Sequence, residues 1–184
     1  EMGLIIQIGR WVIQESMTQI KTWESLGLQV KKVSVNVSPK QFQDHGLVDY
    51  LKDMMSKNDI HPYDFEIEIT ESVLLDDIDQ NIKILEQIKE LGINIALDDF
   101  GTGYSSLSYL TYIPVDKIKL DKSLKDRFLN MENEQAIKGL VALCHGLELD
   151  VVVEGVETKK ESETLKLQNV DYFQGYYYSR PMIS

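Results

Sequence analysis

The sequence predicts an α/β protein built as a TIM-type (β/α) barrel that is incomplete at its N-terminal side. Short β-branched runs alternate with longer amphipathic stretches, which indicates a parallel sheet. The runs end in polar residues, and no glycine-rich dinucleotide turn follows the first of them, which favours a barrel over an open doubly wound sheet. A full barrel needs about 250 residues. The chain has 184 and opens inside a helical pattern, so the shortfall is expected at the front.

Six short runs have the composition of buried strands. Apolar and polar residues alternate within them: Ile67 and Ile69 share one face of the second run, and Glu66 and Glu68 share the other. We expect the apolar face to pack on helices and the polar face to point into the barrel. The strands are expected at 33–37, 65–69, 93–97, 117–120, 151–153 and 172–174.

Helical periodicity fills the remaining stretches. Gly92 is a suitable helix stop and Thr158 a suitable N-cap. The single cysteine, Cys144, excludes an internal disulfide and is expected to be a buried structural thiol within a helical pattern. The helical stretches are 4–26, 47–57, 78–91, 121–146 and 158–167.

Composition limits the partners and the location of the chain. With 30 acidic and 19 basic residues the net charge is −11, which disfavours contact with nucleic acids and anionic membranes. No run approaches the roughly 18 apolar residues of a membrane span, and the first residues lack the basic start of a signal peptide. We therefore expect one cytoplasmic domain over residues 1–184, although its parent protein can still carry a membrane anchor elsewhere.

Polar side chains close each predicted strand. Because the carboxyl ends of parallel strands meet at one mouth of a barrel, these side chains are expected to form one site. Crowded carboxylates require a cation, and oxygen-only ligands select Mg²⁺, Mn²⁺ or Ca²⁺. The three scattered histidines show no zinc-binding spacing. The candidate metal ligands are Asn36, Glu68, Asp98, Asp99 and Glu154.

This site chemistry suits hydrolysis at phosphorus. Adjacent Asp98 and Asp99 fit a two-metal arrangement, and Lys119 is a lone cation that can orient an attacking water. Each residue also has a structural interpretation: the aspartates as a turn and cap, Glu68 as a surface residue, Lys119 as an ion-pair partner, and Gln174 as a buried amide. Their shared position at strand ends favours a joint site. Packing at the barrel rim is favoured over base stacking for the residues Tyr176, Tyr177 and Tyr178.

Motifs along the whole chain resemble those of the EAL-domain cyclic-di-GMP phosphodiesterases. The long segment DDFGTGYSSL at 98–107 is highly specific. The resemblance implies hydrolysis of cyclic-di-GMP to linear pGpG with Mg²⁺ or Mn²⁺, two ions being expected and Ca²⁺ being inhibitory or non-productive. The other segments, in order, are VNVS at 35–38, EIEITES at 66–72, KLD at 119–121, EGVE at 154–157 and QGY at 174–176.

The resemblance also implies roles for individual residues. The five candidate ligands look like metal ligands, Lys119 like the lysine that polarises water, and Asp99 and Glu154 like partners in catalysis. Residues resembling substrate-binding or supporting groups are Glu71, Asp121, Glu157 and Gln174. Glu71 and a loop are expected to link the site to a homodimer, and that loop contains Phe100, Gly101, Thr102, Gly103, Tyr104 and Ser105. Nucleotide-cyclase or sensory domains are expected in the same parent chain.

The sequence departs from the family at one point. The Glu-Ala-Leu motif, whose glutamate is a metal ligand in the family, is absent from the 184 residues. We therefore expect the parent domain to be an active hydrolase and these residues alone to be inactive or weakly active. Two alternatives remain: a degenerate domain that binds cyclic-di-GMP as a non-catalytic receptor, and a protein-interaction module. The intact motifs favour catalysis.

Overall fold

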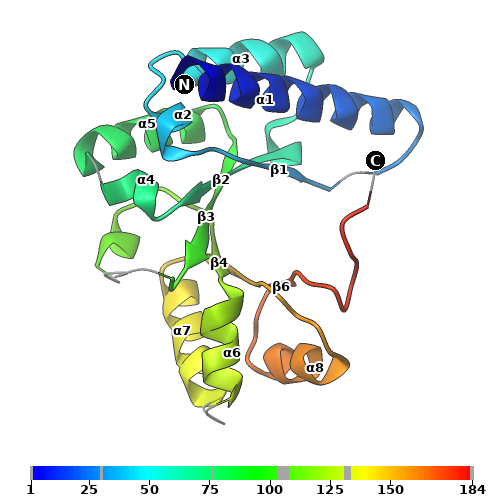
Figure 1. Ribbon diagram of the computed structural model, residues 1–184, viewed down its shortest axis with the longest axis vertical. Helices are drawn as coiled ribbons and strands as arrows, with labels where there is room; N and C mark the ends of the chain where they lie inside the picture. The colour runs from blue at the N-terminus through cyan, green and yellow to red at the C-terminus, as the bar shows by residue number, and fades with distance from the viewer. Residues whose placement is uncertain (1, 30, 76, 103–107, 131–133, 183–184) are drawn as a thin grey trace. The chain divides into compact units, whose positions relative to one another are not determined.

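Six strands lie in the sheet order β1-β2-β3-β4-β5-β6 of the computed structural model, with helices between them (Figure 1). The structure describes residues 2–29, 31–75, 77–102, 108–130 and 134–182. The pairs β1–β2, β4–β5 and β5–β6 are parallel, as predicted. The strands are β1 (Val33–Asn36), β2 (Phe65–Thr70), β3 (Asn94–Phe100), β4 (Lys117–Leu120), β5 (Asp150–Val153) and β6 (Tyr172–Phe173).

The chain divides into two compact units, residues 1–96 and 97–184, and β3 spans the boundary. The helices of the first unit are α1 (Met2–Ser25), α2 (Pro39–Phe42), α3 (Leu47–Asn58), α4 (Ser72–Leu75) and α5 (Ile78–Glu90), with the 3₁₀ turn η1 (Pro62–Asp64). The second unit contains η2 (Tyr109–Thr111), α6 (Lys122–Asn130), α7 (Glu134–Gly146) and α8 (Lys159–Leu167).

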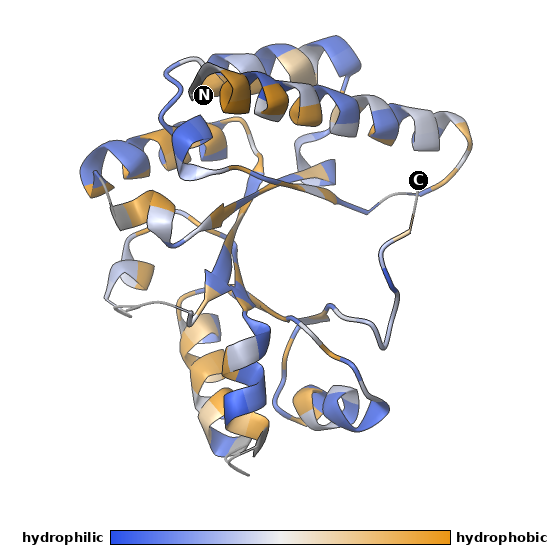
Figure 2. Cartoon of the chain, viewed as in Figure 1, coloured by the Kyte–Doolittle hydropathy of each residue, from blue (hydrophilic) through white to orange (hydrophobic). Residues whose placement is uncertain are grey.

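In the first unit the long helix α1 packs against α2, α3 and β1, and Figure 1 shows α1 and α3 side by side. Ile13, Met17 and Ile20 recur at helical spacing and are buried, so they form the inner face of α1. Figure 2 shows hydrophobic residues concentrated in the N-terminal half of this helix. A two-pronged contact from Arg10 to Asp44, at 3.1 and 2.7 Å, ties α1 to the segment after α2.

In the second unit α7 packs on β5. The helix buries Ile137, Val141 and Cys144, and the facing strand is the apolar run ending at Val153. The prediction of a buried structural thiol is confirmed, and burial raises the pKa of Cys144 to about 11. The predicted helical stretch 121–146 contains two helices, α6 and α7. Among the described residues, none of the helices combines the length and apolar character needed to span a membrane.

Three local features refine the sequence analysis. The strand β3 continues to Phe100 because the Phe100 carbonyl accepts the backbone N–H of Asp121 at 3.2 Å. The short helices α2 and α4 were not predicted, since four residues are too few to show helical periodicity. The cap at Thr158 is confirmed: its side chain accepts the N–H of Glu161 at 3.2 Å in a capping box.

Candidate metal centre

The carboxyl ends of β3, β4 and β5, which all lie in the second unit, carry an acidic cluster. Asp98 and Asp99 are near the end of β3, Lys119 is in β4, and Glu154 directly follows β5. The backbone N–H of Glu154 donates to the Leu120 carbonyl at 3.0 Å, which continues the β4–β5 pairing to the cluster. The parallel pairing therefore brings these side chains to the same edge of the sheet, as the sequence predicted.

The cluster combines three carboxylates with one ammonium group. Carboxylate oxygens of Asp98, Asp99 and Glu154 lie within 4.8 Å of one another. The Lys119 Nζ atom is 2.9 Å from Asp98 Oδ1 and 2.8 Å from Glu154 Oε1. The lysine is only 5% exposed, so little water screens these contacts. Three carboxylates and one ammonium group sum to a formal charge of −2, which one divalent cation would balance.

The spacing of the oxygens suits such a cation. Ligand oxygens bind Mg²⁺ at about 2.0–2.1 Å and Ca²⁺ at about 2.3–2.6 Å, so oxygens around one ion are separated by roughly 3–5 Å. The carboxylate oxygens lie within 4.8 Å of one another, which is compatible with this range. Lys119 contacts one oxygen of Asp98 and one of Glu154, and each carboxylate has a second oxygen. The residues present therefore fit a divalent metal ion.

Asp99 has an unusual backbone conformation for a residue with a side chain. Its φ is +56°, in the left-handed region, which costs about 1–2 kcal/mol for most residues. The Asp98 carboxylate accepts the Asp99 N–H at 3.0 Å, and the Asp99 carbonyl accepts the Thr102 hydroxyl at 2.9 Å. The aspartate pair thus forms a turn and also presents both carboxylates to the cluster. The two interpretations of this pair are compatible, and strain of this kind is concentrated at functional sites.

The first unit carries two further candidate ligands. Asn36 and Glu68 are register partners at the carboxyl ends of β1 and β2, and the Val37 N–H donates to the Glu68 carbonyl at 2.9 Å. Glu68 is 9% exposed, which contradicts its interpretation as a surface residue, whereas Asn36 is exposed. Their assignment as metal ligands stays a prediction. Glu71 directly follows β2, and its link to dimerisation is likewise a prediction.

Glu66 is an ionisable residue that sequence reasoning left out of the site. It shares a face of β2 with Glu68 and is 2% exposed. Its carboxylate accepts the Ser34 hydroxyl at 2.8 Å and lies 3.4 Å from Lys32 Nζ. Strand alternation places Glu66 on the polar face, but it lies near the start of β2, away from the carboxyl end where ligands are expected.

A cavity of about 320 Å³ opens beside Glu154. The predicted supporting residues Glu157 and Gln174 both line it, and Gln174 is exposed, so it is not a buried core amide. The backbone N–H of Gln174 donates to the Val153 carbonyl at 2.9 Å, and the Gln174 carbonyl accepts the Val156 N–H at 3.0 Å. The complete lining is Lys122, Glu154, Gly155, Glu157, Gln174, Gly175 and Tyr176.

Asp121 and the tyrosines have local structural contacts. The Asp121 carboxylate accepts the Ser123 N–H at 2.8 Å, at the start of α6, as a helix cap does. Tyr178 packs against the Tyr177 ring at 5.1 Å, and its hydroxyl lies 2.7 Å from the Ser162 hydroxyl, as expected for rim packing. Tyr176 instead lines the cavity. The supporting role of Asp121 stays a prediction.

The predicted loop after β3 is described only in part. Phe100 is buried, and Gly101 has φ +97° with the Leu124 side chain 2.6 Å from where a Cβ would lie, which explains the glycine. The Thr102 hydroxyl donates to the Asp99 carbonyl, which closes the turn after β3. Gly103, Tyr104 and Ser105 lie outside the described residues.

Gly155→Ala tests the turn that presents Glu154. Gly155 has φ +64°, and an added Cβ would lie 2.6 Å from the Lys122 side chain. We expect this substitution to lower the free energy of unfolding by about 1 kcal/mol or more, measured by urea denaturation. Gly139→Ala is the matched control, because Gly139 lies within α7 with nothing within 4 Å of the new Cβ. The control is expected to stabilise by about 0.5–1 kcal/mol, and equal effects at both sites would contradict this account.

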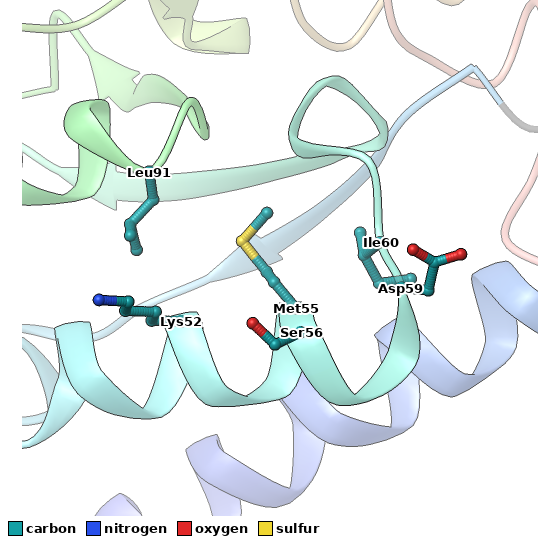
Figure 3. Close-up of a pocket in the computed structure, with 6 residues that line it drawn as sticks. All are labelled: Lys52, Met55, Ser56, Asp59, Ile60 and Leu91. Carbon is teal, nitrogen blue, oxygen red and sulfur yellow. The ribbon is translucent and has the colours of Figure 1, made fainter.

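A second cavity, of about 280 Å³, lies in the first unit at the end of α3 (Figure 3). Figure 3 shows Met55 pointing into this space, with Lys52 and Leu91 on one side and Ile60 and Asp59 on the other. Its lining combines apolar side chains with one cation and one carboxylate. This cavity is not a metal site of the same kind: in the described part of the chain, the side chains that could hold a metal ion as a group of three are Asp98, Asp99 and Glu154.

Comparison with known proteins identifies the family to which the chain belongs. The family model described as EAL domain matches residues 1–181. The chain is 40% identical over 99% of its length to the signaling protein YkoW of Bacillus subtilis. It is 35% identical over 99% of its length to the cyclic di-GMP phosphodiesterase PdeR of Escherichia coli.

Solved structures share the fold. The PaMucR phosphodiesterase in complex with c-di-GMP superposes with a TM-score of 0.90 at 37% identity, covering 99% of this chain and 74% of that one. The FimX EAL domain gives a TM-score of 0.90 at 28% identity, covering 98% and 73%. These matches confirm the predicted TIM-type class. The chain spans about a quarter of its curated relatives, 23% of YkoW and 28% of PdeR.

Proposed function

We propose, from the premise that this chain belongs to the EAL domain family, that its acidic cluster holds Mg²⁺ or Mn²⁺ and binds cyclic-di-GMP through the metal. The intact domain then hydrolyses the ligand to linear pGpG. The observation that supports the proposal is the convergence of Asp98, Asp99 and Glu154 around a buried lysine. An acidic chain needs such a metal to hold an anionic phosphodiester.

Each residue of the cluster has a role in this proposal. Asp98, Asp99 and Glu154 would hold the metal, and the family resemblance proposes Asn36 and Glu68 as further ligands. The metal, when bound, neutralises charge and polarises the phosphodiester. Two ions are proposed, because the adjacent carboxylates of Asp98 and Asp99 would suit a two-metal arrangement. Ca²⁺ is proposed to be inhibitory or non-productive, because its longer bonds and looser geometry differ from those of Mg²⁺.

Lys119 has two functions in this mechanism. Its ammonium group keeps the Asp98 and Glu154 carboxylates close together, and its N–H groups can orient a water toward phosphorus. Hydrolysis consumes that water: its oxygen bonds to phosphorus, one P–O ester bond breaks, and the departing sugar oxygen takes a proton. The cavity beside Glu154, lined by Gln174 and Tyr176, offers space for part of the dinucleotide.

The setting of the domain is part of the proposal. We expect the domain to form homodimers and to act within a parent protein that carries nucleotide-cyclase or sensory domains. Two relatives support the expectation of further domains by name: MucR of Pseudomonas aeruginosa is a bifunctional diguanylate cyclase/cyclic di-GMP phosphodiesterase, and DosP of Escherichia coli is an oxygen sensor. The chain covers 26% and 22% of these two proteins.

A second function is a non-catalytic receptor for cyclic-di-GMP, or a protein-interaction module. Product analysis separates the two functions. After incubation of the chain with cyclic-di-GMP, we expect slow formation of pGpG in Mg²⁺ or Mn²⁺ and none in Ca²⁺, measured by chromatography. Metal-dependent binding without any pGpG would support the receptor and contradict hydrolysis by these residues alone.

A further inference from the structure

Lys125 is a buried cation outside the acidic cluster. Its side chain, in the first turns of α6, is only 1% exposed. The Nζ atom donates to the Gly155 carbonyl at 2.6 Å and lies 2.9 Å from Asp126 Oδ1 and 3.2 Å from Glu161 Oε1. A buried ammonium requires such partners, and a hydrogen bond from a charged donor is about twice as strong as a neutral one. The contact to Gly155 is therefore a firm restraint on the backbone next to Glu154.

Glu161 extends this restraint along the same segment. While Oε1 contacts Lys125, Oε2 accepts the backbone N–H groups of Glu157 at 2.7 Å and Thr158 at 3.0 Å. Burial opposes ionisation of this carboxyl group, but the two backbone donors and Lys125 outweigh burial and lower its pKa. One lysine and one glutamate thus hold three backbone groups between residues 155 and 158.

Glu154 lies between two anchors as a result. On its N-terminal side, its own N–H is bonded to the Leu120 carbonyl at 3.0 Å. On its C-terminal side, the Gly155 carbonyl is bonded to Lys125. The intervening Gly155 has the left-handed φ of +64°, and because glycine adopts many backbone conformations at little steric cost, the glycine alone does not fix this turn. The direction of the Glu154 side chain therefore depends on the second anchor as well as on the strand.

We propose that Lys125 is a positioning residue, which fixes the segment 154–158 and thereby directs the Glu154 carboxylate toward Asp98 and Asp99. This inference rests on the proposed metal site and adds to it a residue from a different helix. The Lys125 ammonium group contacts Gly155, Asp126 and Glu161, and none of these three is a proposed metal ligand. Its effect is transmitted through the Gly155 carbonyl and through Glu161.

Lys125→Met tests the proposal, because methionine keeps the length of the side chain and removes the donor. Lys159→Met is the matched control: Lys159 pairs with Glu163 at 3.5 Å in the neighbouring α8, and its side chain is 75% exposed. Two quantities are measured for each variant in its folded state. They are the hydrogen-exchange rates of the Glu157 and Thr158 amides without metal, and the affinity for Mn²⁺ alone by calorimetry.

We expect Lys125→Met to accelerate exchange at these two amides and to weaken Mn²⁺ binding by about tenfold or more, as for other residues that orient metal ligands. The control is expected to change neither quantity. If Lys125→Met does not fold, Lys125→Gln is measured instead, because its amide can still donate to Gly155. Lower thermal stability with unchanged Mn²⁺ affinity would show a merely structural lysine and overturn the proposal. Absence of Mn²⁺ binding by the unsubstituted chain would overturn the proposed function, whereas unchanged amide exchange would overturn only this inference.

Discussion

Lys119→Met is expected to destabilise the metal-free protein by about 3 kcal/mol or more, because it leaves the Asp98 and Glu154 carboxylates without their shared cation. The two carboxylates are 13% and 19% exposed, so water screens their repulsion only weakly. Adding Mn²⁺ is expected to recover part of this loss, since the metal supplies the missing positive charge. Urea denaturation in EDTA and in Mn²⁺ measures both effects.

The control for this prediction is Lys57→Met. Lys57 pairs with Asp53 at 2.6 Å one turn apart on α3, but its side chain is 62% exposed. Pairs of this kind contribute about 0–1 kcal/mol, and Mn²⁺ is expected to make no difference to the control. A Lys119→Met variant that behaves like the control, or one whose loss is the same in EDTA and Mn²⁺, would contradict the assignment of a metal to this cluster.

Asp99→Asn is expected to weaken Mn²⁺ binding by about 100-fold, which is about 2.7 kcal/mol, while leaving the stability of the metal-free protein within about 0.5 kcal/mol of the original. Asparagine has the same shape and adopts the left-handed conformation readily, so φ near +56° is kept. The substitution therefore removes a charge without disturbing the turn. Calorimetry with Mn²⁺ and urea denaturation in EDTA separate the two quantities.

Asp59→Asn is a close match for this experiment. Asp59 is also an aspartate with a positive φ, +50°, and its side chain is fully exposed beyond the end of α3. We expect neither Mn²⁺ affinity nor stability to change beyond experimental error. If Asp99→Asn binds Mn²⁺ as well as Asp59→Asn does, Asp99 is a turn residue only and the two-ion arrangement loses one of its proposed ligands.

The sequence was sufficient to predict the strands and the acidic cluster, for a physical reason. Buried parallel strands have a characteristic composition, and polar residues at their carboxyl ends are conspicuous against it. Asp98, Asp99, Lys119 and Glu154 could therefore be grouped before their contacts were known, and the structure confirms that they converge. The motif resemblance added the proposed ligand, which strand patterns alone do not supply.

Residues whose role depends on long-range contacts were not predicted. In the sequence, Lys125 has the pattern of an ordinary surface residue of a helix. It is buried because α6 lies near Gly155 and Glu161. Glu66 gave a weak signal through strand alternation, but its partners Ser34 of β1 and Lys32, just before β1, lie 32 and 34 residues earlier in the chain. Contacts of this kind are set by tertiary packing, which local sequence patterns do not encode.

The most direct test of the central claim is a calorimetric titration of cyclic-di-GMP into the chain, once with Mn²⁺ and once with EDTA. The proposed site predicts measurable binding in Mn²⁺ that disappears in EDTA and in the Asp99→Asn variant. Binding of equal strength in EDTA would show that the ligand is held without a metal ion and would contradict the proposed site. Absence of binding with Mg²⁺, Mn²⁺ and Ca²⁺ alike would contradict the assignment of a cyclic-di-GMP site to these residues.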